Sequence, residues 1–215
     1  MLVDWLGRMA IDEFRSRFLR VAPTAQPGTT LAARSLLDWN VLDRVLRAGP
    51  DVLVVSRGVL LAIPPPRTVK ELAEYFAGGV GLCIRHAQRH DAGLASVAAA
   101  FEPLGAAQVQ LFVTPAGTHG FGWHYDDEDV FIAQSTGRKD YYFRANTVSD
   151  APASPAMFER FHRETSPLGT ATLVAGDFLY VPSRWWHMAI CHQHALSISV
   201  GVRLGAAPDV AGQRS

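Results

Sequence analysis

The chain has 215 residues and a formal net charge of zero, because 20 lysines and arginines balance 20 aspartates and glutamates. Apolar residues make up 48% of the sequence and charged residues 19%, which is typical of a globular chain with a sizeable core. The charge balance argues against a broad contact with nucleic acid, and no apolar run is long enough for a membrane span. With two cysteines and no basic leader before an apolar stretch, we expect a cytoplasmic protein without disulfides.

The length favours one domain over residues 1–215, and its first part, residues 1–104, is predicted to be helix-rich. Helices are predicted over residues 12–20, 38–47, 68–76 and 92–102, and strands over residues 51–55, 59–63 and 80–84. Thr68 and Glu71 have the spacing of a capping box at the start of the third helix. Gly78 and Gly79 predict where that helix ends.

The second part, residues 105–205, is predicted to form a β barrel. Strands are expected over residues 107–114, 130–134, 172–174, 178–181 and 195–202, where apolar, β-branched and aromatic residues gather between turn residues. Tyr141-Tyr142-Phe143 adds an alternating stretch that also predicts a strand. Residues 206–215 are small and polar and indicate a tail.

A candidate metal site is formed by His124-Tyr125-Asp126 together with His187, which follows a later strand. Residues two apart on extended backbone project from the same face, so one metal ion could take both His124 and Asp126. Gly120 and Gly122 allow a tight backbone path into the motif. Two histidines and one carboxylate make a facial triad, which leaves the opposite face of the metal open and suits Fe(II) and O2 chemistry.

The spacing of His124 and Asp126 is a weak signal without its setting. With 8 histidines and 20 acidic residues, such a pair arises nearly once by chance, and His162-Arg163-Glu164 is a second instance. That second pair lies in residues 157–164, a stretch typical of a short helix, where positions two apart diverge. The strands and turns around His124 therefore favour the first pair as the ligands.

The segments around these residues resemble the JmjC-type, cupin-like 2-oxoglutarate oxygenases, within them the branch that includes the ribosomal oxygenases. The resemblance is carried by residues 114–117, 120–127, 129–134, 137–139 and 176–187, and it is specific from about residue 107 to 202. It implies a mainly β fold with flanking helices, in which a double-stranded β-helix (cupin or jelly roll) forms the barrel. Because the chain ends soon after its last predicted strand, we expect no counterpart of the C-terminal domains of that branch.

The resemblance also implies a ligand set. His124, Asp126 and His187 would be the catalytic residues and would hold Fe(II), with 2-oxoglutarate and O2 as cosubstrates. The family holds the far carboxylate of 2-oxoglutarate with a basic residue on the strand after the motif, and Lys139 occupies that position. A cation is needed there because an unpaired buried charge is very costly. Arg138 and Arg203 are the alternatives to Lys139.

One position departs from the family pattern. Where the family commonly has a tyrosine whose hydroxyl helps to hold the cosubstrate, this chain has Phe112. Since Phe112 offers no hydrogen bond, the candidates for the hydroxyl that helps to hold the cosubstrate are Thr114, Thr118, Tyr125 and Tyr141.

Three functions stay open at this point. The first is hydroxylation of a C–H bond in a protein or peptide side chain, and the second is hydroxylation of a small molecule, such as a free or carrier-bound amino acid. The third is a metal-binding cupin without catalysis, with a sensing or scaffold role. No nucleic-acid or membrane partner is expected, and the oligomeric state is left open, with a homodimer as one alternative.

Other residues of metal-binding or aromatic type are given structural interpretations. His86 and His90, and the cluster of Cys191, His192 and His194, are expected in loops or turns. Asp127, Glu128 and Asp129 are expected to form a solvated acidic rim. His119 is a candidate support for the site, and Trp185 and Trp186 form either a stacking platform or part of the core.

Overall fold

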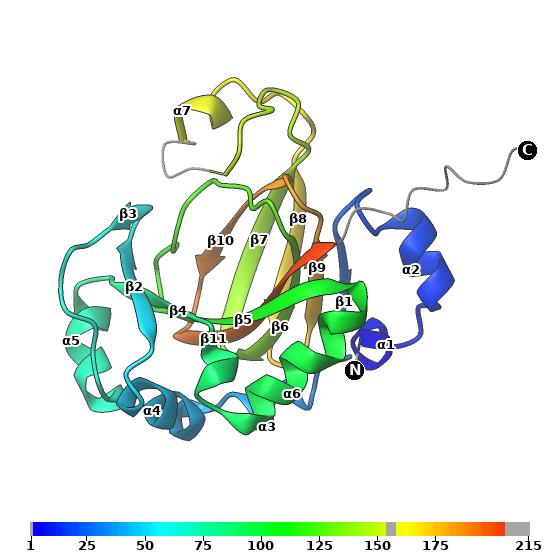
Figure 1. The fold of residues 1–215 in the computed structure, drawn as a ribbon. Helices are drawn as coiled ribbons and strands as arrows, with labels where there is room; N and C mark the ends of the chain where they lie inside the picture. Colours follow the sequence, from blue (N-terminus) through cyan, green and yellow to red (C-terminus); the bar gives the residue numbers. More distant parts are fainter. Residues whose placement is uncertain (1, 154–157, 205–215) are drawn as a thin grey trace, which may run out of the picture.

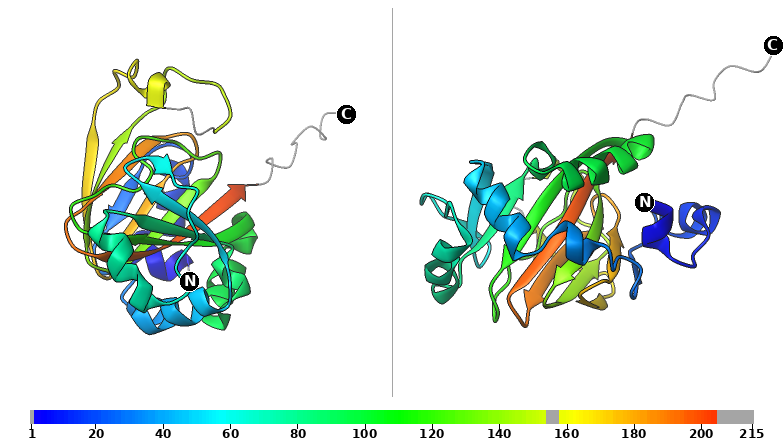
Figure 2. Two further views of the ribbon diagram at one scale, coloured as in Figure 1. Left: turned by 90° about the vertical axis from the view of Figure 1, so that its left-hand side faces the viewer. Right: turned by 90° about the horizontal axis from the view of Figure 1, so that it is seen from below.

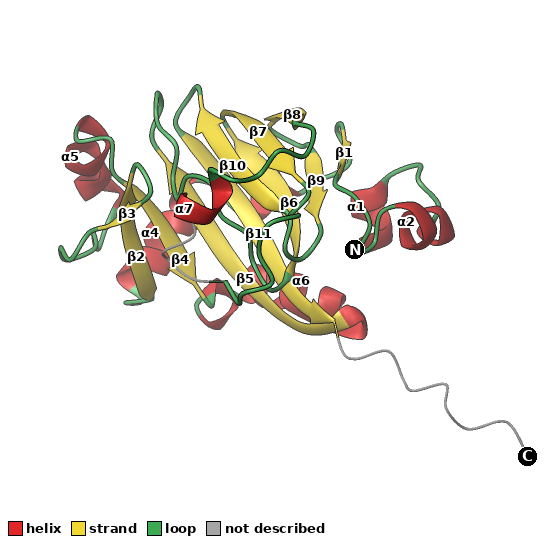
Figure 3. Cartoon of the chain, turned by 90° about the horizontal axis from the view of Figure 1, so that it is seen from above, coloured by secondary structure: helices red, strands yellow, loops and turns green. Residues whose placement is uncertain are grey.

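The computed structural model describes residues 2–153 and 158–204, and Figures 1 and 2 show how its elements are arranged. The tail predicted over residues 206–215 lies outside the described residues, as does the start of the helix predicted over 157–164. In the described part, two antiparallel sheets are accompanied by several short helices (Figure 3).

The larger sheet has eight strands in the order β1-β9-β6-β11-β5-β4-β2-β3. Their bounds are β1 Thr24–Gln26, β2 Asp51–Ser56, β3 Val59–Leu60, β4 Gly81–Arg85, β5 Gly105–Thr114, β6 Asp129–Thr136, β9 Phe178–Val181 and β11 Ala195–Leu204. The central pairing is that of β11 with β5, which is antiparallel and in register over the whole length of both strands. The strands predicted over 51–55, 80–84, 107–114, 130–134, 178–181 and 195–202 are confirmed.

The smaller sheet has three strands in the order β10-β7-β8, with bounds β7 Arg138–Arg144, β8 Gly169–Val174 and β10 Trp186–Cys191. Strand β10 is absent from the sequence prediction, which placed His187 beyond the end of a strand rather than inside one. Among the described residues, two isolated bridges, His119 with Ile190 and His124 with His187, connect the smaller sheet to the loop after β5. The structure therefore has two facing sheets and does not show the closed barrel that was predicted.

The two-residue period of the strands divides the side chains of the larger sheet between two cores. On β6 and β9, Phe131 and Phe178 belong to the large core shared with the helices, whereas Ile132 and Leu179 belong to a second core with residues of β7 and β8. On β5, Val109, Leu111 and Val113 also face the helices. Because successive residues of a strand point to opposite faces, Phe112 and Thr114 face the space between the two sheets.

Helices α1 to α6 contribute to the core on the outer face of the larger sheet. Their bounds are α1 Leu2–Leu6, α2 Ile11–Arg17, α3 Ala33–Leu36, α4 Trp39–Arg47, α5 Leu72–Ala77 and α6 Ala92–Phe101. Helix α7, Phe158–Phe161, lies apart from them in the connection between β7 and β8 (Figure 1). The prediction of a helix-rich part over residues 1–104 is wrong in one respect, because β1 to β4 of that part belong to the same sheet as the later strands. Their pairing with β9 and β5 makes residues 1–104 continuous with the rest of the fold.

Several predicted boundaries are too long. The first helix ends at Arg17 instead of Arg20, and Arg20 has a left-handed backbone with φ of 60°. Strand β3 stops at Leu60, before the run of prolines. The capping box is not formed, because the Thr68 hydroxyl bonds the Glu71 carboxylate instead of a backbone N–H, and the segment starts as a 3-10 helix. Asp38 does cap α4, by accepting from the backbone N–H of Val41 at 2.7 Å.

Candidate metal centre

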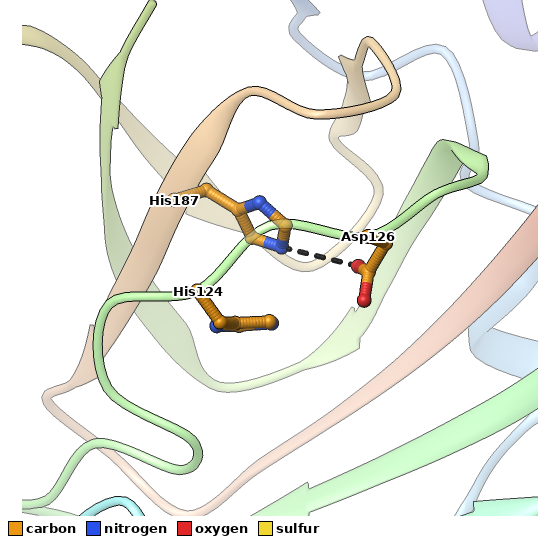
Figure 4. A group of neighbouring side chains, drawn as sticks. All are labelled: His124, Asp126 and His187. Carbon is orange, nitrogen blue, oxygen red and sulfur yellow. Dashed lines mark ion pairs between the residues drawn. The ribbon is translucent and has the colours of Figure 1, made fainter. Parts of the chain in front are cut away.

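His124, Asp126 and His187 come together in the structure, although His187 lies far from the other two in the sequence (Figure 4). One ligand atom from each lies within 4.8 Å of the other two, and His187 Nε2 is 3.5 Å from an Asp126 oxygen. Ligands at right angles on a metal with bonds of about 2.1 Å lie about 3 Å apart. The three side chains thus need only a small movement to share one ion, and the described residues offer no other such group.

Backbone hydrogen bonds fix the relative position of the three residues. The amide of His187 donates to the carbonyl of His124 at 2.8 Å, and the amide of His124 donates to the carbonyl of His187 at 3.1 Å. The amide of Arg184 donates to the carbonyl of Asp126 at 2.7 Å. Two segments far apart in sequence are therefore joined at the ligands themselves, so the site exists as a unit of the backbone.

Each histidine has its Nδ1 committed to a carbonyl two residues before it. His124 Nδ1 donates to Gly122 at 2.8 Å, and His187 Nδ1 donates to Trp185 at 3.0 Å. This choice of tautomer leaves the Nε2 lone pair of each ring free for a metal ion. The donor set of two imidazole nitrogens and one carboxylate oxygen fits a divalent transition metal such as Fe(II).

Burial favours the neutral ring of His187. Its pKa is lowered to about 4, chiefly because burial penalises the charged ring and also because His124 is adjacent, while Asp126 acts in the opposite direction. A metal ion therefore meets little competition from protons at His187 near neutral pH.

A cluster of aromatic side chains packs next to His124, Asp126 and His187. Tyr125 and Trp186, which alternate with the ligands along the chain, form a small core with Trp123, Val148 and Phe161. Trp123 stacks on Phe161 at 4.1 Å between ring centroids. Phe161 lies in α7, in the long connection between β7 and β8 that Figure 1 shows above the ends of these strands. Trp186 is fully buried, so it is a core residue and not the stacking platform that the sequence left open.

A cavity extends from the metal ligands into the space between the two sheets. Its wall includes His187, Tyr141 and Lys139 from the smaller sheet and Phe112 and Thr114 from β5. Lys139 is 3% exposed, and its Nζ donates to the Ser197 hydroxyl at 3.0 Å. Burial lowers the pKa of Lys139 to about 8. Within the described part of the chain Lys139 forms no ion pair, and the carboxylate that lines the same cavity, Asp126, belongs to the triad.

The alternatives to Lys139 lie elsewhere. The Arg203 side chain is 71% exposed and bonds Glu128 at 3.1 Å, and the Arg138 side chain is half exposed and lies 3.7 Å from Asp140. Neither arginine lines the cavity. Of the hydroxyl candidates, Thr114 lines the cavity, whereas Thr118 is used in its own turn, where it donates to Pro115 at 2.9 Å.

Tyr125 and Tyr141, the tyrosine candidates, are placed differently. The Tyr125 hydroxyl donates to the carbonyl of Ala151 at 2.6 Å, and the Tyr125 ring packs against Trp186 on the side away from the cavity. Tyr141 lines the cavity and is 5% exposed.

A second cleft opens on the outer side of the ligands. It is lined by the turn between β2 and β3, by Phe121 and Trp123, and by His124 and Asp126 themselves. His119 lies in this wall, and its Nδ1 is buried without a partner. His124 and Asp126 therefore lie between an inner cavity and an outer cleft. No sequence motif indicated that the β2–β3 turn lines the outer cleft.

Some of the other sequence interpretations need correction. Asp129 is buried and accepts a hydrogen bond from Tyr180, and Glu128 is 9% exposed, so the predicted acidic rim is not solvated as a whole. Cys191, which was expected in a turn, is buried at the end of β10. His192 and His194 do lie in the turn after it, where His192 pairs with Asp140 at 2.6 Å and His194 stacks on Phe76. Glu164 of the second His-x-acid pair bonds Thr147 at 2.7 Å and so closes a loop.

A family model described as the JmjC domain matches residues 84–210, which include all three ligands and Lys139. The chain belongs to the JmjC family. This membership agrees with the family that the resemblance indicated.

Relatives of this JmjC chain include proteins that are much longer. It is 38% identical over 98 residues to a bifunctional lysine-specific demethylase and histidyl-hydroxylase, NO66, of Dictyostelium discoideum, with 44% of this chain and 19% of that protein covered. It is 31% identical over 98 residues to ribosomal oxygenase 1 of Danio rerio, with 45% of this chain and 18% of that protein covered. The aligned part thus spans less than a fifth of either relative.

Solved structures show the same fold. The Escherichia coli ribosomal oxygenase YcfD, in complex with cobalt and 2-oxoglutarate, superposes with a TM-score of 0.65 at 19% identity. The superposition covers 93% of this chain and 53% of that one, so the JmjC chain spans about half the length of YcfD.

Among the described residues, no helix is both long and apolar enough to cross a membrane.

Proposed function

We propose that this protein is an Fe(II)- and 2-oxoglutarate-dependent hydroxylase that acts on a C–H bond of a protein or peptide side chain. The observation that carries the proposal is the pairing of two features in one cavity. A triad of His124, Asp126 and His187 lies at its mouth, and the unpaired buried cation of Lys139 lies in its wall.

In this proposal the three ligands hold Fe(II) on one face and leave the other face open. Iron there would supply the oxidising chemistry with O2, and the protein would supply position and charge. Fixed Nδ1 hydrogen bonds keep both imidazoles oriented, so their Nε2 atoms converge with the carboxylate of Asp126.

The inner cavity has the features needed to bind 2-oxoglutarate. A 2-oxo acid that bound at the metal through one end would place a far carboxylate in the region of Lys139. That carboxylate would neutralise a cation that burial otherwise penalises, so each charge would offset the desolvation cost of the other. Thr114, in the same wall, is a further hydroxyl within the cavity.

The outer cleft supports a peptide-like substrate. It opens beside His124 and Asp126, and its lining combines aromatic side chains with the exposed Val59 and Leu60 of β3. An open, partly apolar cleft of this kind suits an extended segment that presents one side chain to the metal. Histidyl hydroxylation and ribosomal oxygenation in the names of relatives agree in class with such a substrate.

The proposal is tested by turnover of 2-oxoglutarate in the absence of a known substrate. Purified protein with Fe(II), ascorbate and O2 should convert 2-oxoglutarate slowly to succinate, and Asp126→Ala should abolish the conversion. Asp127→Asn is the matched control, because Asp127 is adjacent but bonds Ala153 and Arg184 and does not line the cavity. Failure of the wild type to bind Fe(II) and to form succinate would contradict the proposal.

A further inference from the structure

Tyr141 brings a phenol hydroxyl into the cavity, whereas Phe112 on strand β5 has none. It lies two residues after Lys139 on β7, so both side chains enter the cavity from the same face of the strand. Register places it between the two ends of the cavity: Phe143 is opposite the ligand His187, Tyr141 is opposite Ala189, and Lys139 is opposite Cys191. A molecule that reached from the metal to Lys139 would pass Tyr141.

Ser197 lies near both Lys139 and Tyr141. Its hydroxyl accepts a hydrogen bond from Lys139 Nζ at 3.0 Å. The single proton of Ser197 has an acceptor of its own, Gln134 Oε1 at 2.9 Å. The Gln134 amide nitrogen is used by the carbonyl of Thr136 at 2.6 Å, which fixes the orientation of the side chain. Ser197 is therefore held in place by Lys139 and Gln134, and neither of these hydrogen bonds uses the Tyr141 hydroxyl.

At the position across from Ser197, the facing strand β5 has no hydroxyl. Phe112 is the register partner of Ser197 on β5, and Lys139 Nζ lies 5.9 Å from the centre of its ring. A carboxylate beside Lys139 would thus meet an aromatic ring on the β5 side and the Tyr141 hydroxyl on the β7 side. Burial raises the pKa of Tyr141, so the phenol keeps its proton at neutral pH and can donate it.

We propose that Tyr141 is a cosubstrate-binding residue, whose hydroxyl donates a hydrogen bond to the far carboxylate of 2-oxoglutarate while Lys139 supplies the charge. This inference rests on the proposed function and goes further, because it assigns the hydroxyl that Phe112 lacks to the opposite sheet. A carboxylate is a strong acceptor, so the Tyr141 hydroxyl would donate to the ligand when the ligand binds. The pair Lys139 and Tyr141 would then select 2-oxo acids that carry a second carboxylate.

The test compares two ligands that differ in that carboxylate. Calorimetry without O2, with Mn(II) in the site, gives the Kd of 2-oxoglutarate and of 2-oxovalerate, which lacks the far carboxylate. Tyr141→Phe should raise the Kd of 2-oxoglutarate by about tenfold or more, the typical cost of a hydrogen bond to a charged group. The Kd of 2-oxovalerate should stay within about twofold of the wild type.

Tyr142→Phe is the matched control, since Tyr142 lies on the other face of β7 and does not line the cavity. Adding the hydroxyl on the facing strand, in Phe112→Tyr with Tyr141→Phe, should restore part of the affinity for 2-oxoglutarate. Thermal melts of each variant establish that it is folded.

Two results would overturn the inference while leaving the proposed function intact. One is an unchanged Kd of 2-oxoglutarate in Tyr141→Phe, and the other is an equal loss for both ligands, which would make Tyr141 a packing residue. A wild-type protein that binds Mn(II) but neither 2-oxo acid would remove the proposed function itself, and this inference with it.

Discussion

His124 and His187 exchange two backbone hydrogen bonds across an isolated antiparallel bridge, with N to O distances of 3.1 and 2.8 Å. Their rings consequently lie 4.2 Å apart between centroids before any ion is considered. A site that the backbone assembles in this way needs little reorganisation on metal binding. The fold, and not the metal, should therefore be responsible for most of its geometry.

Removal of the carboxylate ligand should weaken metal binding strongly without unfolding the protein. The side chain of Asp126 is 43% exposed, so Asp126→Ala leaves no large cavity in the core. We expect the Kd of Mn(II) or Co(II) to rise by roughly a hundredfold, at the upper end of the range for supporting residues of metal sites. Metal titration followed by calorimetry measures this, with Asp127→Asn as the neutral comparison. Equal Kd values for the two variants would remove Asp126 from the ligand set.

The aromatic support behind the ligands should couple stability to metal affinity. Phe161→Ala removes the stack on Trp123 at 4.1 Å and the edge contact with Trp186 at 5.5 Å. We expect a loss of about 1–3 kcal/mol in the free energy of unfolding, given the partial burial of Phe161. Metal affinity should fall as well, because Trp123 and Trp186 directly adjoin His124 and His187 in sequence.

Leu168→Ala in the same connection is the control for Phe161, because Leu168 is 50% exposed. Urea unfolding and metal titration of both variants provide the comparison. A Phe161 variant that lost stability but kept the metal affinity of the wild type would show that the aromatic cluster does not position the ligands.

The buried charge of Lys139 should lower the free energy of unfolding of the protein when no 2-oxoglutarate is bound. Burial lowers its pKa from 10.5 to about 8, so the folded state disfavours the charged side chain. At pH 7, Lys139→Met should raise the free energy of unfolding of the free protein by roughly 1–3 kcal/mol while the affinity for 2-oxoglutarate collapses. Thermal unfolding and calorimetry test the two effects, and a destabilised methionine variant would contradict the first.

The difference in free energy of unfolding between the wild type and Lys139→Met should depend on pH, because burial lowers the pKa of Lys139. Below pH 8 the lysine is charged in both states, and the full cost of burying the charge is present. Between about pH 8 and 10.5 the folded state has lost the proton and the unfolded chain still holds it, so folding becomes more favourable as the pH rises. The stability gap between the wild type and Lys139→Met should therefore narrow over this window, and a gap independent of pH would contradict the assignment.

Gly137 should tolerate no side chain. It joins β6 to β7 with φ of 75°, and a Cβ there would lie 2.5 Å from the carbonyl oxygen of His194. Gly137→Ala should cost roughly 2–4 kcal/mol, because the obstacle is backbone. Gly117→Ala is the matched control, with φ of 74° but nothing within 4 Å of the added carbon, and should cost about 1 kcal/mol. Chemical denaturation of both variants tests the difference, and equal losses would contradict the close approach.

The sequence predicted the strands whose two faces differ most clearly in character. The long strands β5 and β11 carry buried apolar residues at alternate positions, and both were found within a few residues of their bounds. Strand β10 was missed, because Trp186-His187-Met188-Ala189-Ile190-Cys191 has no alternation of polar and apolar residues. Its pairing with β7 depends on tertiary contacts, which cannot be read from the sequence alone.

Spacing and setting predicted that His124, Asp126 and His187 lie together, and the structure brings them together, whereas their supporting contacts could not be predicted. The partners of both imidazole Nδ1 atoms are backbone carbonyls, at Gly122 and Trp185, and any residue type at those positions has a carbonyl. Among the cations, sequence order left Arg203 open, and only the register of β11 shows it paired with Glu128 at the surface. Tyr141 likewise required the register of β7 to be placed beside Lys139.

The most direct test of the central claim is the binding of 2-oxoglutarate with and without the metal ion. Anaerobic calorimetry of the wild-type protein should show binding with a stoichiometry of one when Fe(II) is present and at least a hundredfold weaker binding when a chelator has removed it. The same dependence on Fe(II) should be lost in His187→Ala. Binding of equal strength with and without Fe(II), or no binding in either case, would contradict the account.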